Sequence, residues 1–135
     1  MRGIKHSVAV IVASICVVGS AAAQQMTGGE IRSFVSGKTL YVETGAASVT
    51  GVIGKGAIYL AEDGTGLYKT PTGAVWHGTW TVKGDNYCSD WKEGQKRPCQ
   101  RFEKQGDAVN SFDVETGQLR VKITKTVPGN AENLK

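Results

Sequence analysis

Glycine recurs at nearly even intervals through this chain, at positions 64, 73, 84, 94, 106 and 117, in steps of 9 to 12 residues. Regular turn signals at this spacing are typical of an all-β sandwich or barrel built from short strands. The pair Asp63-Gly64 predicts a tight hairpin turn, and Gly84-Asp85 predicts a second, less strongly. The glycine-rich segment 44–56 lacks alternation and predicts a loose loop.

The segments between these turns alternate apolar and polar residues. The run AVWHGTWTV (74–82) places Trp76, Trp80 and Val82 on one face and His77, Thr79 and Thr81 on the other. This period of two is typical of antiparallel strands that bury one face. Trp80 is therefore expected to be a core residue.

The run QLRVKITKT (118–126) has the same period. It predicts a buried face formed by Leu119, Val121 and Ile123 and a solvent face formed by Arg120, Lys122 and Thr124. Further strands are expected in KTLYVET, AIYLAE, GLYKT and AVNSFDVE.

One helix is expected near the start of the globular part, in TGGEIRSFVSG. Thr27 and Glu30 have the spacing of a capping box. Ile31, Phe34 and Val35 share a helical face, and Gly37 can end the helix. The predicted fold class is mainly β: a small antiparallel barrel or strongly curved sheet of about 7–8 strands. It carries one N-terminal helix and one disulfide-stapled hairpin.

The first residues have the pattern of an export signal. Arg2 and Lys5 precede the apolar run VAVIVASICVV (8–18), and Ala21 and Ala23 frame a small-residue cleavage site. The run is short for a membrane span, which needs about 20 residues. The expected organisation is a signal peptide at 1–23, cleaved after Ala23, and a single β-rich domain at 24–135. Cys16 falls within the discarded segment.

The predicted export determines how the remaining cysteines, Cys88 and Cys99, are interpreted, because two lone cysteines in an oxidising compartment usually form a disulfide. Their spacing differs from that of zinc ligands and of a redox C-x-x-C pair. We expect a disulfide between Cys88 and Cys99. If the two cysteines share one face of their strands, Tyr87, Trp91 and Phe102 fall on the other.

Charge and motifs exclude several functions. The net charge of +4 falls to +2 once Arg2 and Lys5 are removed, and the basic residues do not cluster, which argues against a nucleic-acid surface. The stretch SGKT (36–39) lacks the first glycine of a phosphate-binding loop, and GVIGKG (51–56) has the wrong glycine order for a dinucleotide site. EDGTG (62–66) has too few carboxylates for a calcium loop. No cofactor and no metal site is expected.

Catalytic side chains are sparse. His77 is the only histidine after the signal segment, and its strand position places it on the polar face, away from Trp76 and Trp80. Asp113 and Glu115 share a face and could in principle form a glycosidase pair. Their spacing is more typical of solvated carboxylates on an outward face. No catalytic residue is assigned, and no enzymatic activity is expected.

The aromatic residues Tyr68, Trp76, Trp80 and Trp91 are the candidates for a binding site. Aromatic side chains dominate the cores of small domains, so a packing role is the simpler interpretation. The alternative is that they line a ligand cavity in a small barrel.

The order GLYKTPTG, WHGTWTVKGDNYCSDW, CQRFEKQGD and PGNAENL resembles a family of small exported alphaproteobacterial proteins, catalogued as a domain of unknown function. The matching positions span nearly the whole chain after the signal segment: Gly37-Lys38-Thr39, Gly78, Trp80, Cys88, Trp91, Cys99 and Pro128-Gly129-Asn130. The overall plan is also similar to that of calycins such as lipocalins and small barrel inhibitors. These resemblances imply a fold and a compartment rather than an activity.

The expected function is that of a periplasmic, non-enzymatic protein, a monomer that binds a small apolar ligand or an envelope or protein partner. It is not expected to bind nucleic acid or to keep a membrane anchor after signal removal. An inhibitor-like protein that binds a hydrolase is the alternative, with an enzyme of unrecognised type as a further one. A large apolar cavity would favour ligand carriage, and a filled core with an exposed apolar loop would favour a protein partner.

Overall fold

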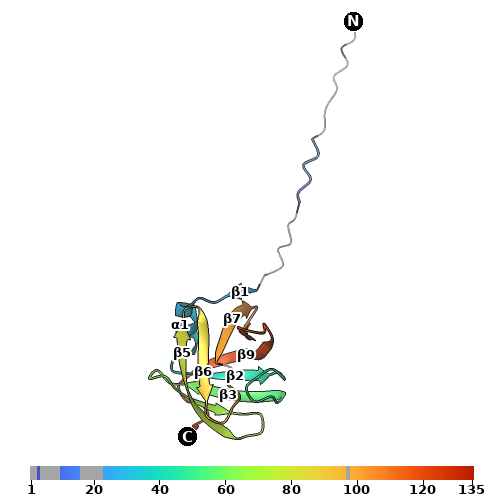
Figure 1. Cartoon of the computed structure of the whole chain (residues 1–135). Helices are drawn as coiled ribbons and strands as arrows, with labels where there is room; N and C mark the ends of the chain where they lie inside the picture. Colours follow the sequence, from blue (N-terminus) through green and yellow to red (C-terminus); the bar gives the residue numbers. More distant parts are fainter. Residues whose placement is uncertain (1–2, 4–9, 16–22, 97) are drawn as a thin grey trace.

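The computed structural model describes residue 3 and residues 10–15, 23–96 and 98–135 of the chain. Strands form 50 % of the described residues, and the one helix among them forms 7 %. The elements, most of which are labelled in Figure 1, are in chain order β1 (Gln24–Gln25), α1 (Gly28–Val35), β2 (Lys38–Thr44), β3 (Gly54–Leu60), β4 (Thr65–Lys69), β5 (Val75–Lys83), β6 (Asn86–Trp91), β7 (Cys99–Gln105), β8 (Ala108–Asp113) and β9 (Leu119–Pro128).

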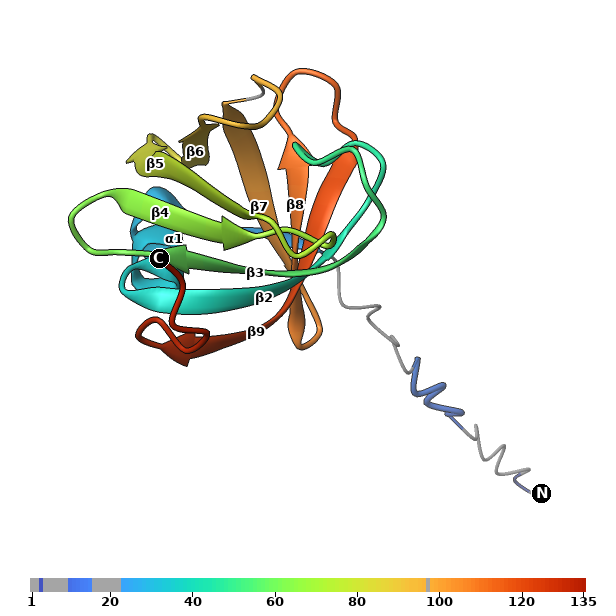
Figure 2. The same ribbon diagram turned by 90° about the horizontal axis from the view of Figure 1, so that it is seen from below.

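Strands β2 to β9 form a closed antiparallel barrel. Each pairs with the next along the chain, and β9 pairs back onto β2, from Lys38↔Pro128 to Thr44↔Val121. Figure 2, a view from below, shows the strands arranged around the enclosed core. The predicted small barrel with one N-terminal helix and one disulfide is confirmed.

The two ends of the barrel are built differently. At one end, here the helix end, the strands are joined by short turns at 61–64, 84–85 and 106–107. At the other, here the loop end, the connections 45–53, 70–74, 92–98 and 114–118 are longer. The two predicted hairpin turns both lie at the helix end. Gly64 there has a positive φ of 90°, a conformation that glycine adopts readily.

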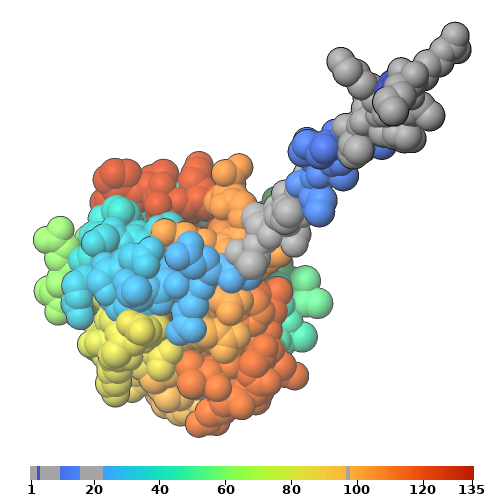
Figure 3. Space-filling model, turned by 90° about the horizontal axis from the view of Figure 1, so that it is seen from above, coloured from blue at the N-terminus to red at the C-terminus, as the bar shows by residue number. Residues whose placement is uncertain are grey.

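Helix α1 covers the helix end. Thr27 and Glu30 form the predicted capping box, and Asp85 Oδ1 accepts a 2.8 Å hydrogen bond from the Gly28 N–H. The Asp85 carboxylate thus ties the start of the helix to the β5–β6 turn. Ile31 and Val35 are fully buried against the core. Figure 3 shows α1, in light blue, lying across this end beside the yellow β5–β6 region.

Strand β1 fills a gap between β6 and β7 that the sequence patterns did not predict. Strand β6 pairs with β7 only from Cys99 to Arg101. Beyond that point β1 takes the free edge of β7, with Gln25 opposite Glu103 and Gln24 opposite Lys104. An unpaired edge would expose a row of backbone donors and acceptors, so β1 removes a site of unwanted strand pairing.

The cysteines and the aromatic residues lie back to back, as expected. Cys88 and Cys99 are directly opposite on β6 and β7 and form the predicted disulfide, so the expectation is confirmed. Tyr87 and Phe102 pack against each other on the core side, with ring centroids 5.2 Å apart. The disulfide thus fastens the short β6–β7 pairing without occupying the core.

Two glycines make room for Trp91. Gly66 and Gly78 are cross-strand partners on β4 and β5. A Cβ atom at either position would lie within 3.0 Å of the Trp91 ring, at 2.9 Å from Gly66 and 2.8 Å from Gly78. The small residues therefore let the 3 %-exposed indole lie flat against the barrel wall.

The alternation predicted for β9 is wrong at its start. Val121 pairs with Ser111 and Leu119 pairs with Phe112, so Arg120 is an extra residue in a β-bulge. The bulge reverses which of these side chains faces the core: Arg120 is 1 % exposed and Leu119 is 46 % exposed. Lys122 is exposed and Ile123 is buried, as expected.

The last residues pack on the outside of the barrel. Thr39 Oγ1 donates to the Gly129 carbonyl and accepts from the Ala131 N–H. The Asn130 side chain closes a turn by bonding both the N–H and the carbonyl of Leu134. These contacts give the PGNAENL segment a structural role.

Most of the expected signal peptide lies outside the described residues, and its cleavage after Ala23 stays a prediction. Within the described part, no helix is both long and apolar enough to cross a membrane.

Trp80 provides a test of the packing. It is 7 % exposed, and its indole N–H donates a 2.8 Å hydrogen bond to the Ala61 carbonyl. Trp80→Ala is expected to lower the free energy of unfolding by about 3–5 kcal/mol, because it leaves a large cavity. Trp76→Ala is the matched control, since Trp76 is only half-buried and should lose less. Denaturant unfolding with both variants measures this, and equal losses would contradict the assignment of Trp80 to the core.

Candidate functional site: a charged cavity inside the barrel

The four candidate aromatic residues separate into two pairs. Tyr68 and Trp91 lie on the wall of a cavity within the barrel, with ring centroids 5.5 Å apart. Trp76 and Trp80 are not on that wall; Trp76 stacks edge-on against Tyr68, and Trp80 belongs to the core cluster. Only half of the candidate set therefore faces an enclosed space.

The enclosed cavity is small, with a volume of about 30 Å³. Pockets for drug-sized ligands are about 300–1,000 Å³, roughly ten times larger or more. The wall is mainly apolar, with a polar group formed by Tyr68, Tyr87, Ser89, Gln100 and Arg120. Among these described lining residues there is one cation and no acidic side chain.

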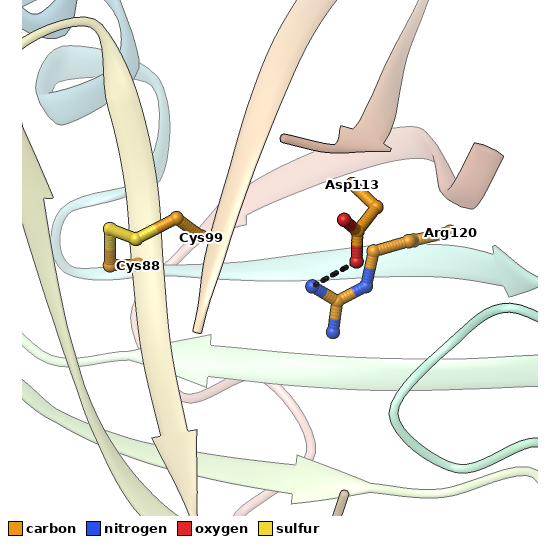
Figure 4. Close-up of a disulfide and its surroundings, with 4 residues drawn as sticks. All are labelled: Cys88, Cys99, Asp113 and Arg120. Atoms are coloured by element: carbon orange, nitrogen blue, oxygen red, sulfur yellow. Dashed lines mark ion pairs between the residues drawn. A yellow bond between two sulfur atoms is a disulfide. The ribbon is translucent and has the colours of Figure 1, made fainter. Parts of the chain in front are cut away.

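Arg120 is the residue that the sequence pattern placed outside. The β9 bulge directs its side chain into the barrel. Its Nη1 lies 3.9 Å from Oδ2 of Asp113 at the end of β8, and Figure 4 shows the two groups pointing toward each other. The carboxylate compensates part of the charge that burial would otherwise strongly disfavour.

Asp113 also differs from its prediction. The sequence pattern grouped it with Glu115 as a solvated carboxylate on an outward face, but Asp113 is 6 % exposed. Its Oδ1 accepts hydrogen bonds from the N–H groups of Glu115, at 2.9 Å, and Thr116, at 3.0 Å. Asp113 therefore holds the β8–β9 turn with one oxygen and faces Arg120 with the other.

Two hydroxyl groups at the cavity, those of Tyr68 and Ser89, are buried and make no hydrogen bond of normal length; each has only a weaker contact, Tyr68 with Thr50 and Ser89 with Tyr87. Burial raises the pKa of the Tyr68 hydroxyl well above its usual value and raises the pKa of Tyr87 to about 12. Both phenols therefore stay protonated at neutral pH and can act as donors. A buried hydroxyl without a hydrogen bond of normal length favours a bound water or ion beside it.

The loop 45–53 closes the barrel above this cavity. Val49 is buried and lies on the cavity wall, and its carbonyl accepts a hydrogen bond from the Gln95 N–H across the opening. The Gly45 N–H donates to the carbonyl of Arg120 at 3.1 Å. The loose loop predicted for 44–56 is therefore wrong at its ends, because Thr44 belongs to β2 and β3 begins at Gly54, and the part between the two strands covers the loop end.

The same loop presents apolar side chains to solvent. Val52 is 39 % exposed and Ile53 is 77 % exposed. Val114 and Leu119, 44 % and 46 % exposed, lie at the same end of the barrel. Among the residues described from 23 onward, these four are the exposed large apolar side chains.

His77 lies on the outer face of β5 and is exposed, as its strand position predicted. Its ring Nδ1 is 3.3 Å from Glu93 Oε1, and its backbone N–H donates to Glu93 Oε2 at 3.0 Å. The backbone hydrogen bond from His77, together with its ring, lowers the pKa of the Glu93 carboxyl. Glu93 comes from the β6–β7 loop, and no pattern in the sequence places it beside His77. An exposed pair of this kind contributes little to stability.

A search of the described residues finds no group of three or more His, Cys, Asp or Glu side chains placed to hold a metal ion. Comparison of the chain with protein-family models, curated proteins and solved structures yields no match.

The Arg120–Asp113 pair can be tested by removing one charge and then both. Arg120→Met is expected to lower the free energy of unfolding by about 3–5 kcal/mol, because it leaves the buried carboxylate without its cation. Adding Asp113→Asn, which keeps an oxygen for the turn, should restore part of that loss. Chemical denaturation of both variants measures the effect, and an Arg120→Met protein as stable as wild type would contradict a buried pair.

The buried tyrosines predict a loss of stability at alkaline pH. An unfolded tyrosine ionises near pH 10, whereas folded Tyr87 keeps its proton to about pH 12. Below pH 10 both states are protonated, so the stabilisation is complete; from pH 10 to 12 only the unfolded state releases the proton, and the free energy of unfolding falls. Denaturant unfolding at a series of pH values should show this decline, with a shallower slope for Tyr87→Phe. A slope unchanged by that substitution would contradict the assignment.

Proposed function

We propose that this chain is an exported, non-enzymatic protein that binds a protein partner through the apolar side chains of its loop end. The observation that carries the proposal is the contrast between a filled interior and an exposed apolar loop. The cavity has a volume of about 30 Å³, whereas Ile53 at the loop end is 77 % exposed.

The filled interior argues against carriage of an apolar ligand. Tyr68, Trp91 and Phe102 occupy the space that such a ligand would need, and each is at most 3 % exposed. Admitting a ligand would require displacement of these side chains and of the loop that covers them. Close-packed cores resist such rearrangement, so this barrel is better suited to act through its surface.

The loop end supports a protein partner. Val52 and Ile53 lie next to each other in the longest connection, and Val114 and Leu119 flank a second connection at the same end. Complete burial of one such side chain stabilises a complex by about 1.5–3 kcal/mol. Connecting loops on a rigid scaffold commonly carry binding residues. A protruding apolar loop suits a concave pocket, such as the cleft of a hydrolase, and this is the inhibitor-like form of the proposal.

The compartment is part of the proposal. The Cys88–Cys99 disulfide favours an oxidising environment, and the predicted signal peptide favours export to the periplasm. The resemblance to the family of small exported alphaproteobacterial proteins points the same way. A disulfide alone does not identify a compartment, so the proposal of periplasmic localisation rests on these three points taken together.

Site-specific photo-cross-linking in the source cells tests the proposal. A photoreactive residue at position 53 should give a defined protein adduct. The same residue at position 107, exposed at the helix end, should not give it. Partner capture that is equal at both positions, or absent at 53, would contradict the proposed surface.

The partner identified in this way then permits a quantitative test. Ile53→Asp is expected to weaken its binding by about tenfold or more, because it removes about 1.4 kcal/mol or more of apolar burial. Asp107→Ala is the control and should bind as wild type does. Organic extracts of the purified protein address carriage: a stoichiometric lipid or other apolar compound would favour the ligand-binding alternative.

A further inference from the structure

The polar cavity inside the barrel has features of an ion site, independent of the surface proposed above. We propose that it binds one small inorganic anion of the size of a halide, held by Arg120, Tyr68 and Ser89. The site lies under the 45–53 loop at the loop end of the barrel.

The charge of the wall selects an anion over a cation. Arg120 is the one charged side chain among the described residues that line the cavity. Asp113, its neighbour at 3.9 Å, is not on that wall, and one of its oxygens is bound by two turn amides. An ion inside the cavity therefore lies on the guanidinium side of the pair. Within this ion pair the guanidinium is the member on the cavity wall, so an anion in the cavity is attracted by Arg120 more than it is repelled by Asp113.

The hydroxyl groups supply directional donors. Tyr68 is 1 % exposed and Ser89 is 8 % exposed, and neither hydroxyl makes a hydrogen bond of normal length, although Tyr68 has a weaker contact with Thr50 and Ser89 one with Tyr87. Both side chains line the cavity with Arg120. An anion accepts from each of these groups at once and so satisfies donors that would otherwise be buried without a hydrogen bond of normal length.

The volume restricts the kind of anion. A cavity of about 30 Å³ holds one or two particles the size of a water molecule. A monatomic halide such as chloride has this size. Sulfate and phosphate, with five heavy atoms each, do not fit without moving Tyr68, Trp91 or Val49, which lie on the wall.

The β-bulge in β9 supports a functional role for the site. Without the extra residue in β9, the strand alternation would place Leu119 inside and Arg120 in solvent. Bulges are often found where a strand must redirect a side chain for a function. The irregular β8–β9 pairing at this point thus brings a cation into the barrel.

Water is the competing occupant, because it too can bond these hydroxyls. The two differ in their dependence on salt type. A bound halide raises the stability of the folded protein as its concentration rises and saturates above its dissociation constant. Ordered water gives no such halide dependence.

Thermal unfolding in sodium chloride, bromide and sulfate at equal ionic strength tests the proposal. Wild-type protein is expected to show a rise in Tm with chloride and bromide that saturates at low salt concentration, whereas sulfate gives only the steady, unsaturated rise of a salt excluded from the protein surface. Tyr68→Phe and Ser89→Ala each remove one donor with little change of shape, and each should raise the apparent dissociation constant for bromide by about fivefold or more. Tyr41→Phe, on the outer face, is the matched control and should respond as wild type does.

A crystal grown in sodium bromide supplies a direct readout through the anomalous signal of bromine. A bromide peak between Arg120, Tyr68 and Ser89 that is lost in Tyr68→Phe would support the site. The proposal is overturned if the Tm response is the same for bromide and sulfate in wild type, or if only water occupies the cavity in bromide crystals.

Discussion

The pairing of β9 with β2 is the contact on which the rest of the structure depends. It closes the sheet, so that each strand from β2 to β9 pairs with a neighbour on both sides along at least part of its length. Eight strands enclose a space just wide enough for side chains to fill. Large aromatic side chains therefore fill this space, among them Tyr68, Trp91 and Phe102, and little room remains inside the barrel for a ligand.

Much of the architecture could be predicted from local patterns. The spacing of the glycines, the capping box at Thr27 and the two hairpin turns depend on neighbouring residues, and all appear as expected. The disulfide was predictable because Cys88 and Cys99 have no other partner of their kind beyond the signal segment. Such features are determined over a few residues, where the chemistry of glycine, threonine and cysteine is decisive.

The candidate cavity could not be predicted in the same way. Strict alternation assigns Arg120 to solvent, and only the pairing of β9 with β8 reveals the bulge that buries it. Glu93 meets His77 through a loop, and Asp113 meets Arg120 across a turn. These contacts depend on strand register and loop path, which cannot be derived from one sequence. The positions of the charged side chains in the candidate site are therefore the ones that the sequence predicts least well.

The two ends of the barrel differ in their connections and in the side chains that they expose. The helix end has short turns and a capped helix, with Ile31 and Val35 fully buried. The loop end combines long connections, exposed apolar side chains and the only buried guanidinium of the described chain.

The loop that carries Ile53 also forms the roof of the cavity. Val49 lies on the cavity wall, and the Gly45 N–H is bonded to the carbonyl of Arg120. Whatever fills the cavity therefore contacts the base of the loop whose tip is exposed. Order at the tip depends on the packing of that base, because a loop with few buried contacts opens more readily than the strands beside it. The buried Arg120 and the exposed Ile53 are consequently connected through one loop at the same end of the barrel.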